Sequence, residues 1–202
     1  MIERNLILVR HGQSEWNEKN LFTGWENPGL TDKGMHEAKI AGSLIKNLGI
    51  KFDYMFTSAL IRAQLTGSII LENLDQAEIN IIKNKALNER FYGDLQGLNK
   101  DATREQYGAE QVHIWRRSYD VPPPNGESLE LTANRTIPYL ENNIIPQLSN
   151  GKNLFVAAHG NSLRSIIMSI ESLTKEEVLS LEVPTGVPII YQYQEGSWIK
   201  LN

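Results

Sequence analysis

The chain has 202 residues with no cysteine, a formal net charge of −4, 41% hydrophobic residues and 22% charged residues. The missing cysteines exclude disulfides, thiolate nucleophiles and cysteine-ligated metals, and the acidic balance argues against a nucleic-acid binder. No stretch approaches the ~20 apolar residues of a membrane span, and residues 1–4 lack the features of a signal peptide. We therefore expect a cytoplasmic protein, with residues 1–202 folded as a single domain around one sizeable core.

Predicted strands and helices alternate along the first half of the chain. The predicted strands are residues 6–9, 54–57 and 79–82. The helices between them are residues 31–49, with Thr31 as the N-cap, and residues 58–73, with Ser58 as the N-cap and Arg62 in the first turn. Alternation of this kind is typical of βαβ units and a mainly parallel sheet.

The second half of the chain continues this pattern after a polar, mixed region at residues 86–119. The predicted helices are 100–107, 110–118, 128–148, 163–171 and a short one after Thr174, where Glu177 completes a capping box. Pro138 is expected to kink or break the 128–148 helix. A strand at 154–158 and a hairpin of 189–194 with 197–201 follow. The prediction is an α/β three-layer sandwich, with a mostly parallel central sheet, helices on both faces and an antiparallel C-terminal edge hairpin.

Two segments share one design, an apolar strand followed by histidine, glycine, an amide residue and serine. Residues 6–14 read LILVRHGQS, and residues 154–162 read LFVAAHGNS. Continuous apolar runs are typical of parallel strands buried on both faces, and ligands bind beyond the carboxyl ends of such strands. We therefore expect His11 and His159, each ending its strand, to face each other across one pocket.

A histidine at this position can relay protons, bind a metal ion or act as a nucleophile. The metal interpretation lacks support because no histidine and carboxylate are closely spaced, and because Arg10 would repel a cation. Arginine beside histidine suits a phosphoryl group, whose oxygens accept paired hydrogen bonds from a guanidinium. Arg62, at the N-terminus of a helix, would add a second guanidinium and the favourable end of the helix dipole. The residues therefore favour phosphoryl transfer without a metal.

Seven short motifs are spread over nearly the whole chain. They are RHGQSEWN at 10–17, FTGW at 22–25, LNER at 87–90 with YG at 92–93, LQGLNK at 95–100, WRR at 115–117, AHGNSLR at 158–164 and PTGVP at 184–188. Together they resemble the cofactor-dependent phosphoglycerate mutases of the histidine phosphatase superfamily. The resemblance implies glycolytic and gluconeogenic interconversion of 3-phosphoglycerate and 2-phosphoglycerate. It also implies a phosphohistidine intermediate, 2,3-bisphosphoglycerate as the primer, and no metal.

The resemblance implies a role for each matching residue. His11 would be the nucleophile, and Arg10, Arg62 and His159 would hold the transferring phosphoryl group. Glu89 would be the general acid and base, with a pKa raised by partial dehydration and by nearby phosphate oxygens. The residues implied to bind substrate are Arg10, Ser14, Asn17, Thr23, Gly24, Arg62, Glu89, Tyr92, Lys100, Arg116, Arg117, Gly160 and Asn161.

Several of these interpretations have alternatives. His36 and His113 belong to no motif and are expected on helix surfaces. Arg116 and Arg117 are either an exposed basic pair or, with Lys100, a second anion pocket. Two other functions stay open. One is a phosphatase of the same fold for a small phosphate ester, which needs His11 but not the paired arginines. The other is a non-catalytic binding module for anionic metabolites or phosphopeptides.

The chain departs from the longer members of this family in two places. Residues 122–129 run from the proline-rich stretch into Glu-Ser-Leu with almost no insertion, and the sequence stops at Asn202 without a flexible tail. A less covered site would admit water to the phosphohistidine. We therefore expect a mutase with appreciable phosphatase activity. The family includes monomers, dimers and tetramers, so a homo-oligomer stays open.

Overall fold

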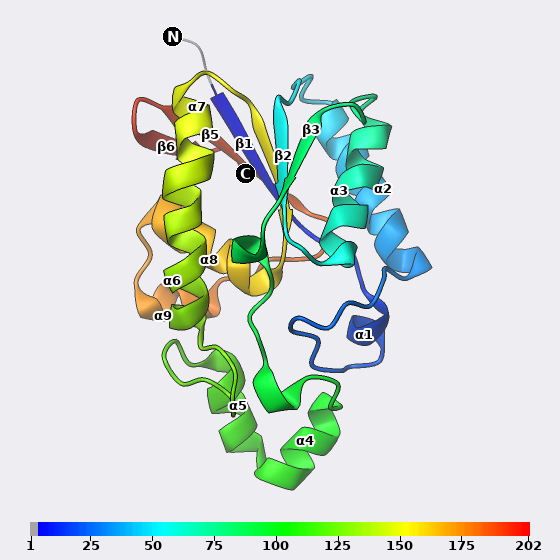
Figure 1. Cartoon of the computed structure of the whole chain (residues 1–202), viewed down its shortest axis with the longest axis vertical. Coiled ribbons are helices and arrows are strands. Elements are labelled where there is room, and N and C mark those ends of the chain that lie inside the picture. Colours follow the sequence, from blue (N-terminus) through cyan, green and yellow to red (C-terminus); the bar gives the residue numbers. More distant parts are fainter. Residues whose placement is uncertain (1–3) are drawn as a thin grey trace.

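The structure is a computed structural model that describes residues 4–202, with a twisted sheet through its centre (Figure 1). Its strands are β1 (Arg4–Arg10), β2 (Tyr54–Thr57), β3 (Asn80–Lys83), β4 (Leu154–Ala158), β5 (Pro188–Gln194) and β6 (Ser197–Lys200). In the order β3-β2-β4-β1-β5-β6, the first four strands are parallel, whereas β5 pairs antiparallel with β1, and β6 with β5. The predicted α/β class, mostly parallel sheet and C-terminal edge hairpin are confirmed.

Helices cover both faces of the sheet and extend beyond one end of it. The helices are α1 (Glu15–Glu18), α2 (Asp32–Lys46), α3 (Ile61–Asn73), α4 (Lys100–Tyr107), α5 (Ala109–Arg117), α6 (Leu129–Tyr139), α7 (Ile145–Ser149), α8 (Gly160–Glu171) and α9 (Lys175–Ser180), with helical turns η1 (Lys85–Leu87), η2 (Gly93–Leu95) and η3 (Leu140–Ile144). Figure 1 shows α2 and α3 beside one face and α6 to α9 beside the other. Helices α4 and α5 lie past the carboxyl ends of β1 and β4.

Alternate side chains of the buried strands fill a separate core on each face. Leu6 and Leu8 of β1 pack with Val156 of β4 under η3, α7 and α8, whereas Ile7 and Val9 pack under α2 and α3. All five side chains are inaccessible to solvent. Because burying each aliphatic side chain contributes about 1.5–3 kcal/mol, β1 and β4 form a firmly held platform for the residues at their ends.

Residues 129–149 are helical throughout, and the α-helix predicted over 128–148 with a kink or break at Pro138 changes its hydrogen-bonding pattern just after that residue. Helix α6 continues past Pro138 to Tyr139, and the π-helical turn η3 then links it to α7. Within this turn the Asn142 side-chain amide donates to the Pro138 carbonyl at 2.8 Å. Pro146 lies in the first turn of α7, where a backbone N–H has no partner within an α-helix. Both prolines are therefore accommodated in a path that stays helical while its type changes after Pro138.

The starts of two helices also differ from the prediction. Ser58 does not cap α3, which begins at Ile61 without a side-chain cap bond, although Arg62 still lies in its first turn. Helix α8 begins at Gly160 instead of residue 163. His159 therefore lies between β4 and α8, one residue past the strand that was expected to end with it. The short link leaves this ring little freedom to move.

A close contact between glycines fixes the loop after β1 against α2. A Cβ atom on Gly12 would lie 2.2 Å from the Gly34 carbonyl oxygen, and one on Gly34 would lie 2.1 Å from that of Gln13. These distances are far inside van der Waals contact, so any larger side chain would push the two segments apart. The contact thereby positions His11, the residue before Gly12.

We expect Gly34→Ala to destabilise the protein, although glycine to alanine in an unobstructed helix stabilises by about 0.5–1 kcal/mol. The new methyl group must displace the Gln13 backbone, and overpacking of this kind typically costs about 1–3 kcal/mol. Urea denaturation would measure the free energy of unfolding. Ser43→Ala, at an exposed position of the same helix, is the control. A Gly34→Ala variant more stable than the wild type would contradict the role of this contact.

Candidate active site

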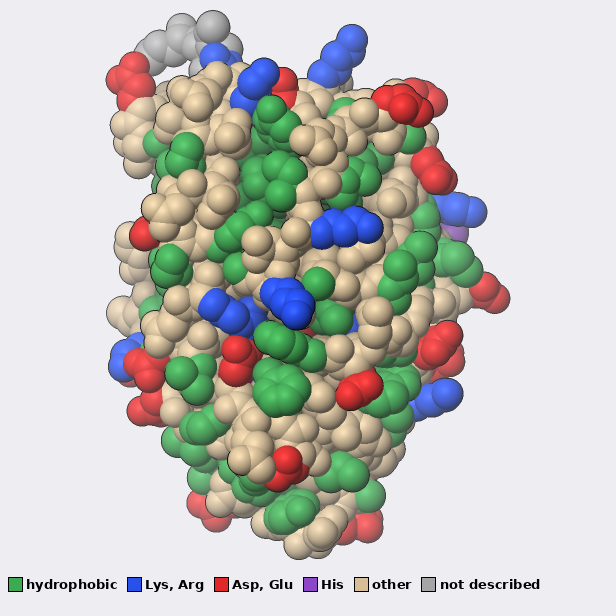
Figure 2. Space-filling model, in the orientation of Figure 1, with side chains coloured by type: hydrophobic (Ala, Val, Ile, Leu, Met, Phe, Trp, Pro, Cys, Tyr) green, Lys and Arg blue, Asp and Glu red, His purple; other side chains and the backbone are tan. Residues whose placement is uncertain are grey.

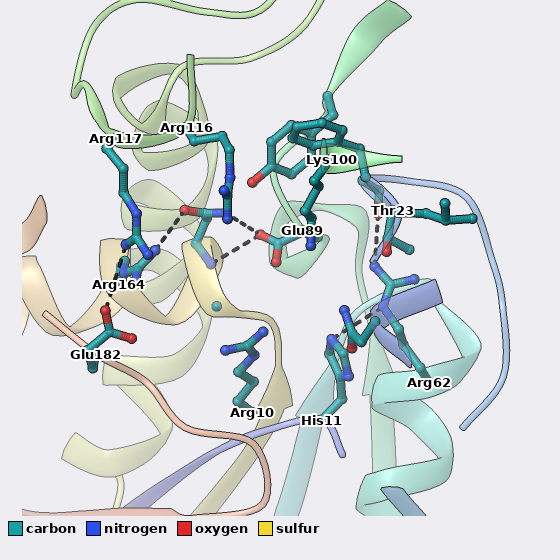
Figure 3. Close-up of a pocket in the computed structure, with 17 residues that line it drawn as sticks. Arg10, His11, Thr23, Arg62, Glu89, Lys100, Arg116, Arg117, Arg164 and Glu182 are labelled. Atoms are coloured by element: carbon teal, nitrogen blue, oxygen red, sulfur yellow. Dashed lines mark hydrogen bonds and ion pairs between the residues drawn. The ribbon is translucent and has the colours of Figure 1, made fainter. Parts of the chain in front are cut away.

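A polar cavity of about 150 Å³ opens beyond the carboxyl ends of β1 and β4. Its size suits a small metabolite, because pockets for drug-sized ligands measure about 300–1,000 Å³. The lining residues are Arg10, His11, Asn17, Leu21, Phe22, Thr23, Gly24, Arg62, Glu89, Tyr92, Lys100, Arg116, Arg117, Gly160, Asn161, Arg164 and Glu182. In Figure 3, His11 and Arg62 lie at one end, Arg116, Arg117 and Arg164 at the other, and Glu89 between them.

Two of the predicted site residues do not line this cavity. Ser14 is fully buried, and its hydroxyl accepts a hydrogen bond at 3.2 Å from the backbone N–H of Asn17, which does line it. The Asn17 side chain in turn accepts from the Ser14 backbone N–H at 3.1 Å, which completes a capping box at α1. Ser14 therefore positions Asn17. The other residue, His159, lies beneath the cavity.

The hydrogen bonds of His11 determine its protonation state. Its Nδ1 lies 2.7 Å from the Gly12 carbonyl oxygen, which can only accept, and its Nε2 lies 3.3 Å from Nε of Arg62, which can only donate. The ring therefore carries its proton on Nδ1 and a lone pair on Nε2. Burial, followed by the charges of Arg62 and Arg10, lowers the pKa of His11 well below its usual value. A neutral ring with an unprotonated Nε2 is the form a nucleophile requires.

His159 is inaccessible to solvent, and its ring meets the His11 ring edge to face with centroids 5.0 Å apart. Oγ of Ser58 lies 2.7 Å from Nε2 of His159 and accepts a hydrogen bond from the Leu60 backbone N–H at 3.1 Å. The hydroxyl keeps its own proton to donate, and in the tautomer in which Oγ donates to Nε2 the imidazole proton lies on Nδ1. Among the described residues, Nδ1 of His159 has no hydrogen-bond partner. It is therefore available to donate to a ligand oxygen.

Two guanidinium groups flank the His11 ring. Nη1 and Nη2 of Arg62 each donate at 2.8 Å to backbone carbonyls of the loop after α1, those of Glu26 and Gly24. Burial is the main cause that lowers the pKa of Arg62, to about 10, and the group stays charged at pH 7. Arg10 donates from Nη1 to the Val183 carbonyl at 2.9 Å. Both guanidiniums are thus held in place before any ligand arrives.

Glu89 lies between the two basic ends of the cavity. One carboxylate oxygen accepts from the Arg90 backbone N–H at 2.8 Å and from the side-chain and backbone N–H groups of Asn161 at 2.9 and 3.1 Å. Burial alone would raise the pKa of this carboxyl. The Arg90 N–H, the Arg10 charge and the Asn161 side chain outweigh burial, so the pKa lies below its usual value. The predicted raised pKa is therefore wrong for the free protein, in which Glu89 is a carboxylate ready to act as a base.

The far end of the cavity is a basic cluster formed by Lys100, Arg116, Arg117 and Arg164. Burial, with the charges of Arg116 and Arg10, lowers the pKa of Lys100, as expected where cations crowd together. Tyr92 lies beside this cluster. Its hydroxyl accepts from the buried Arg90 at 3.0 Å, and its pKa is lowered because nearby arginine charges outweigh burial. Lys100, Arg116 and Arg117 thus line one cavity, and their role as a second anion pocket stays a prediction.

Three residues of the site were not among those predicted from the sequence. Arg164 and Glu182 line the cavity, and Ser58 holds His159. Arg164 belongs to the AHGNSLR motif and lies one helical turn after Asn161, so its position on the same face of α8 was an available signal. Glu182 follows α9 in a loop, where no spacing rule applies. Ser58 was interpreted as a helix cap because serine is common at that position.

On the face shown in Figure 2, basic side chains lie scattered among acidic and uncharged ones.

Within residues 4–202, no cluster of three or more histidine, aspartate or glutamate side chains has an arrangement suited to a metal ion. The same residues include no helix that is long and apolar enough to cross a membrane.

The family model described as histidine phosphatase superfamily (branch 1) matches residues 6–202. A 2,3-bisphosphoglycerate-dependent phosphoglycerate mutase from Parvibaculum lavamentivorans is 60% identical over 190 residues, which are 94% of this chain and 90% of that protein. The chain belongs to the phosphoglycerate mutases of the histidine phosphatase superfamily. The resemblance carried by its seven motifs is confirmed.

Two solved structures have the same fold as this chain. A phosphoglycerate mutase from Bacillus anthracis is 22% identical, with a TM-score of 0.81, over 98% of this chain and 92% of that chain. The α-ribazole phosphatase from Shigella flexneri is also 22% identical, with a TM-score of 0.82, over 98% and 94%. A protein named a mutase and one named a phosphatase thus share this fold, so the fold alone does not distinguish the two activities.

We expect the free energy of unfolding to fall as the pH is lowered below about 6.5. The folded-state pKa values of His11 and His159 both lie well below their usual value, so the unfolded chain binds more protons in this range. Each histidine contributes a slope of up to about 1.4 kcal/mol per pH unit. Urea denaturation between about pH 7.5 and 5.5 would measure it.

The variants His11→Asn and His159→Asn should each reduce this slope. The exposed His113, replaced by Gln, is the control. An unchanged slope in both site variants would mean that neither ring is buried in its neutral form.

We expect Ser58→Ala to lower kcat by about 10- to 100-fold while changing KM little, the range seen when a residue that orients a functional histidine is lost. Without the hydroxyl, Nε2 of His159 loses its partner, and Nδ1 no longer has a defined proton. Thr57→Val is the control, because Thr57 is a neighbouring buried hydroxyl that donates to the Ala157 carbonyl and not to the histidine. Nitrogen chemical shifts of His159 should report the changed tautomer, and unchanged shifts and kcat would refute this role.

Proposed function

We propose that this chain interconverts 3-phosphoglycerate and 2-phosphoglycerate through a phosphohistidine at His11, primed by 2,3-bisphosphoglycerate. The observation that supports this most directly is one small cavity with a neutral histidine at one end and a basic cluster at the other. Such a cavity matches a three-carbon acid that carries anionic groups at both ends. Glu89 lies where a hydroxyl between those groups would be. We also propose a cytoplasmic location, as for a glycolytic enzyme.

Buried donors without partners support an anionic ligand. Among the described residues, four buried side-chain nitrogen or oxygen atoms lack a hydrogen-bond partner. One, Nε of Arg90, belongs to a residue outside the cavity lining, and the other three are Nε of Arg10, Oγ1 of Thr23 and Nδ1 of His159. Buried polar groups are almost always satisfied, so each of these atoms has capacity for a ligand oxygen. A phosphoryl group provides several such oxygens, and Arg10 and Arg62 can balance its charge.

The first half-reaction follows from the tautomer of His11 and the ionisation of Glu89. Once Nε2 of His11 carries the phosphoryl group, the 2-hydroxyl of 3-phosphoglycerate attacks phosphorus. The bond from phosphorus to Nε2 breaks, a bond to the 2-oxygen forms, and the hydroxyl proton moves to the Glu89 carboxylate. The products are 2,3-bisphosphoglycerate, neutral His11 and protonated Glu89. The low pKa of Glu89 in the free protein provides the basic form that this step needs.

The second half-reaction reverses these roles after the bisphosphate turns over in the cavity. Nε2 of His11 attacks the 3-phosphoryl group, the bond from phosphorus to the 3-oxygen breaks, and Glu89 returns its proton to that oxygen. Phosphate oxygens nearby raise the pKa of Glu89 and favour its protonated form at this stage. Arg10, Arg62 and Nδ1–H of His159 would stabilise the charge on the transferring group.

The test is isomerisation of 3-phosphoglycerate with and without catalytic 2,3-bisphosphoglycerate, in the presence of a chelator, with free phosphate measured in the same tube. We expect isomerisation that depends on the primer, and some phosphate release, because the short connection at residues 122–129 leaves the site less covered. His11→Asn should lower the rate by at least about 10³-fold, because the covalent route is lost.

The two products separate the candidate functions. Phosphate release without isomerisation would favour a phosphatase of this fold, and isomerisation unaffected by the primer would exclude the proposed route. His113→Gln, on the surface of α5, is the matched histidine control and should retain full activity.

A further inference from the structure

Glu182 is a carboxylate in a cavity built for anions. It lies in the loop between α9 and β5, lines the cavity, and has a side chain that is 76% exposed. In Figure 3 it lies at the basic end with Arg117 and Arg164. Among the described residues that line the cavity, the only other carboxylate is Glu89, which has a role in the proposed proton transfer. The mechanism leaves Glu182 without a role.

The neighbours of Glu182 differ in how firmly they are held. Arg164 donates from Nε to the Leu181 carbonyl at 2.9 Å and from Nη1 to the side-chain oxygen of Asn161 at 3.3 Å. Arg117 is 37% exposed, and its Nη1 lies 3.8 Å from Oε1 of Glu182. That separation is an ion pair too long for a hydrogen bond. Arg117 can therefore exchange Glu182 for another anion at little cost.

Glu182 should affect the binding of a ligand with two phosphoryl groups more than the binding of a ligand with one. In the free protein, the one phosphoryl group of 3-phosphoglycerate can bind at His11 between Arg10 and Arg62, whereas 2,3-bisphosphoglycerate fills that place and also brings a second, doubly charged group to the basic end of the cavity. This group must replace Glu182 as the partner of Arg117 and then remain near the displaced carboxylate. Repulsion between like charges grows with the charge of the ligand. Glu182 therefore weakens the binding of the bisphosphate more than the binding of 3-phosphoglycerate.

We propose that Glu182 is a specificity-determining residue that weakens the binding of a second phosphoryl group at the basic end of the cavity. The inference rests on the proposed function, since it assumes a ligand with two anionic ends. Its consequence is that the bisphosphate is held loosely enough to turn over between the half-reactions. The opposite role, in which Glu182 orients Arg117 for the ligand, is disfavoured because a long, exposed ion pair fixes geometry poorly.

The test is calorimetric titration of 2,3-bisphosphoglycerate and 3-phosphoglycerate into the wild type and Glu182→Gln. We expect the variant to bind the bisphosphate about two- to fivefold more tightly, the range that one exposed charge provides, and 3-phosphoglycerate less than about twofold more tightly. The gain should shrink at high salt because the site is open to counterions. Glu176→Gln, an exposed position on α9 with the same change of charge, should bind both ligands as the wild type does.

Each outcome separates this inference from the proposed function. Unchanged or weaker binding of the bisphosphate by Glu182→Gln would overturn the inference, as would an equal gain for both ligands. In an Arg117→Met background the gain should be smaller, because the exchange of partners is lost, and a gain of full size would count against the exchange.

Isomerisation by the wild-type preparation is measured alongside. Its absence would overturn the proposed function, whereas a normal rate with no effect of Glu182→Gln would overturn only the inference.

Discussion

The parallel pairing of β1 with β4 is the constraint on which the site depends. The register places Arg10 opposite Ala158, and the His11 backbone N–H donates to the Ala158 carbonyl at 3.0 Å. Both strands then end at the same level, so His11 and His159 meet although 148 positions separate them in the chain. Slippage by two residues would move the rings apart by about 6.6 Å. The buried side chains on both faces of the sheet hold this register.

The site gathers positive charge in a protein whose overall charge is negative. Six basic side chains line the cavity, namely Arg10, Arg62, Lys100, Arg116, Arg117 and Arg164. Their mutual repulsion and burial lower the pKa values of several of them and keep the two histidines neutral. A ligand with anionic oxygens relieves that repulsion, so binding and stability are coupled. Glu89 and Glu182 moderate the same charge, one at the proposed reaction centre and one at the basic end.

Much of the fold could be predicted because its signals are local. The apolar run of β1, the Thr31 cap of α2 and the capping box at Thr174 each depend on neighbours within a few residues. Local signals misled where a side chain that is common in one local role makes a contact with a distant part of the chain. Ser58 has the side chain of a helix cap, but its hydroxyl contacts His159, 101 positions away. Pro138 was expected to kink or break a helix, and α6 does end one residue later, where a π-helical turn that the sequence did not predict continues the path.

The sequence by itself determined the alternating strands and helices, the family, and the identity of most side chains that line the cavity. It could do so because apolar periodicity and short motifs consist of residues that are close together in the chain. Only the tertiary structure decided the protonation of His11, the low pKa of Glu89 and the places of Ser58, Arg164 and Glu182. These depend on burial and on charges brought together from distant segments. Electrostatic interaction follows distance in space, and the order of residues along the chain does not reveal that distance.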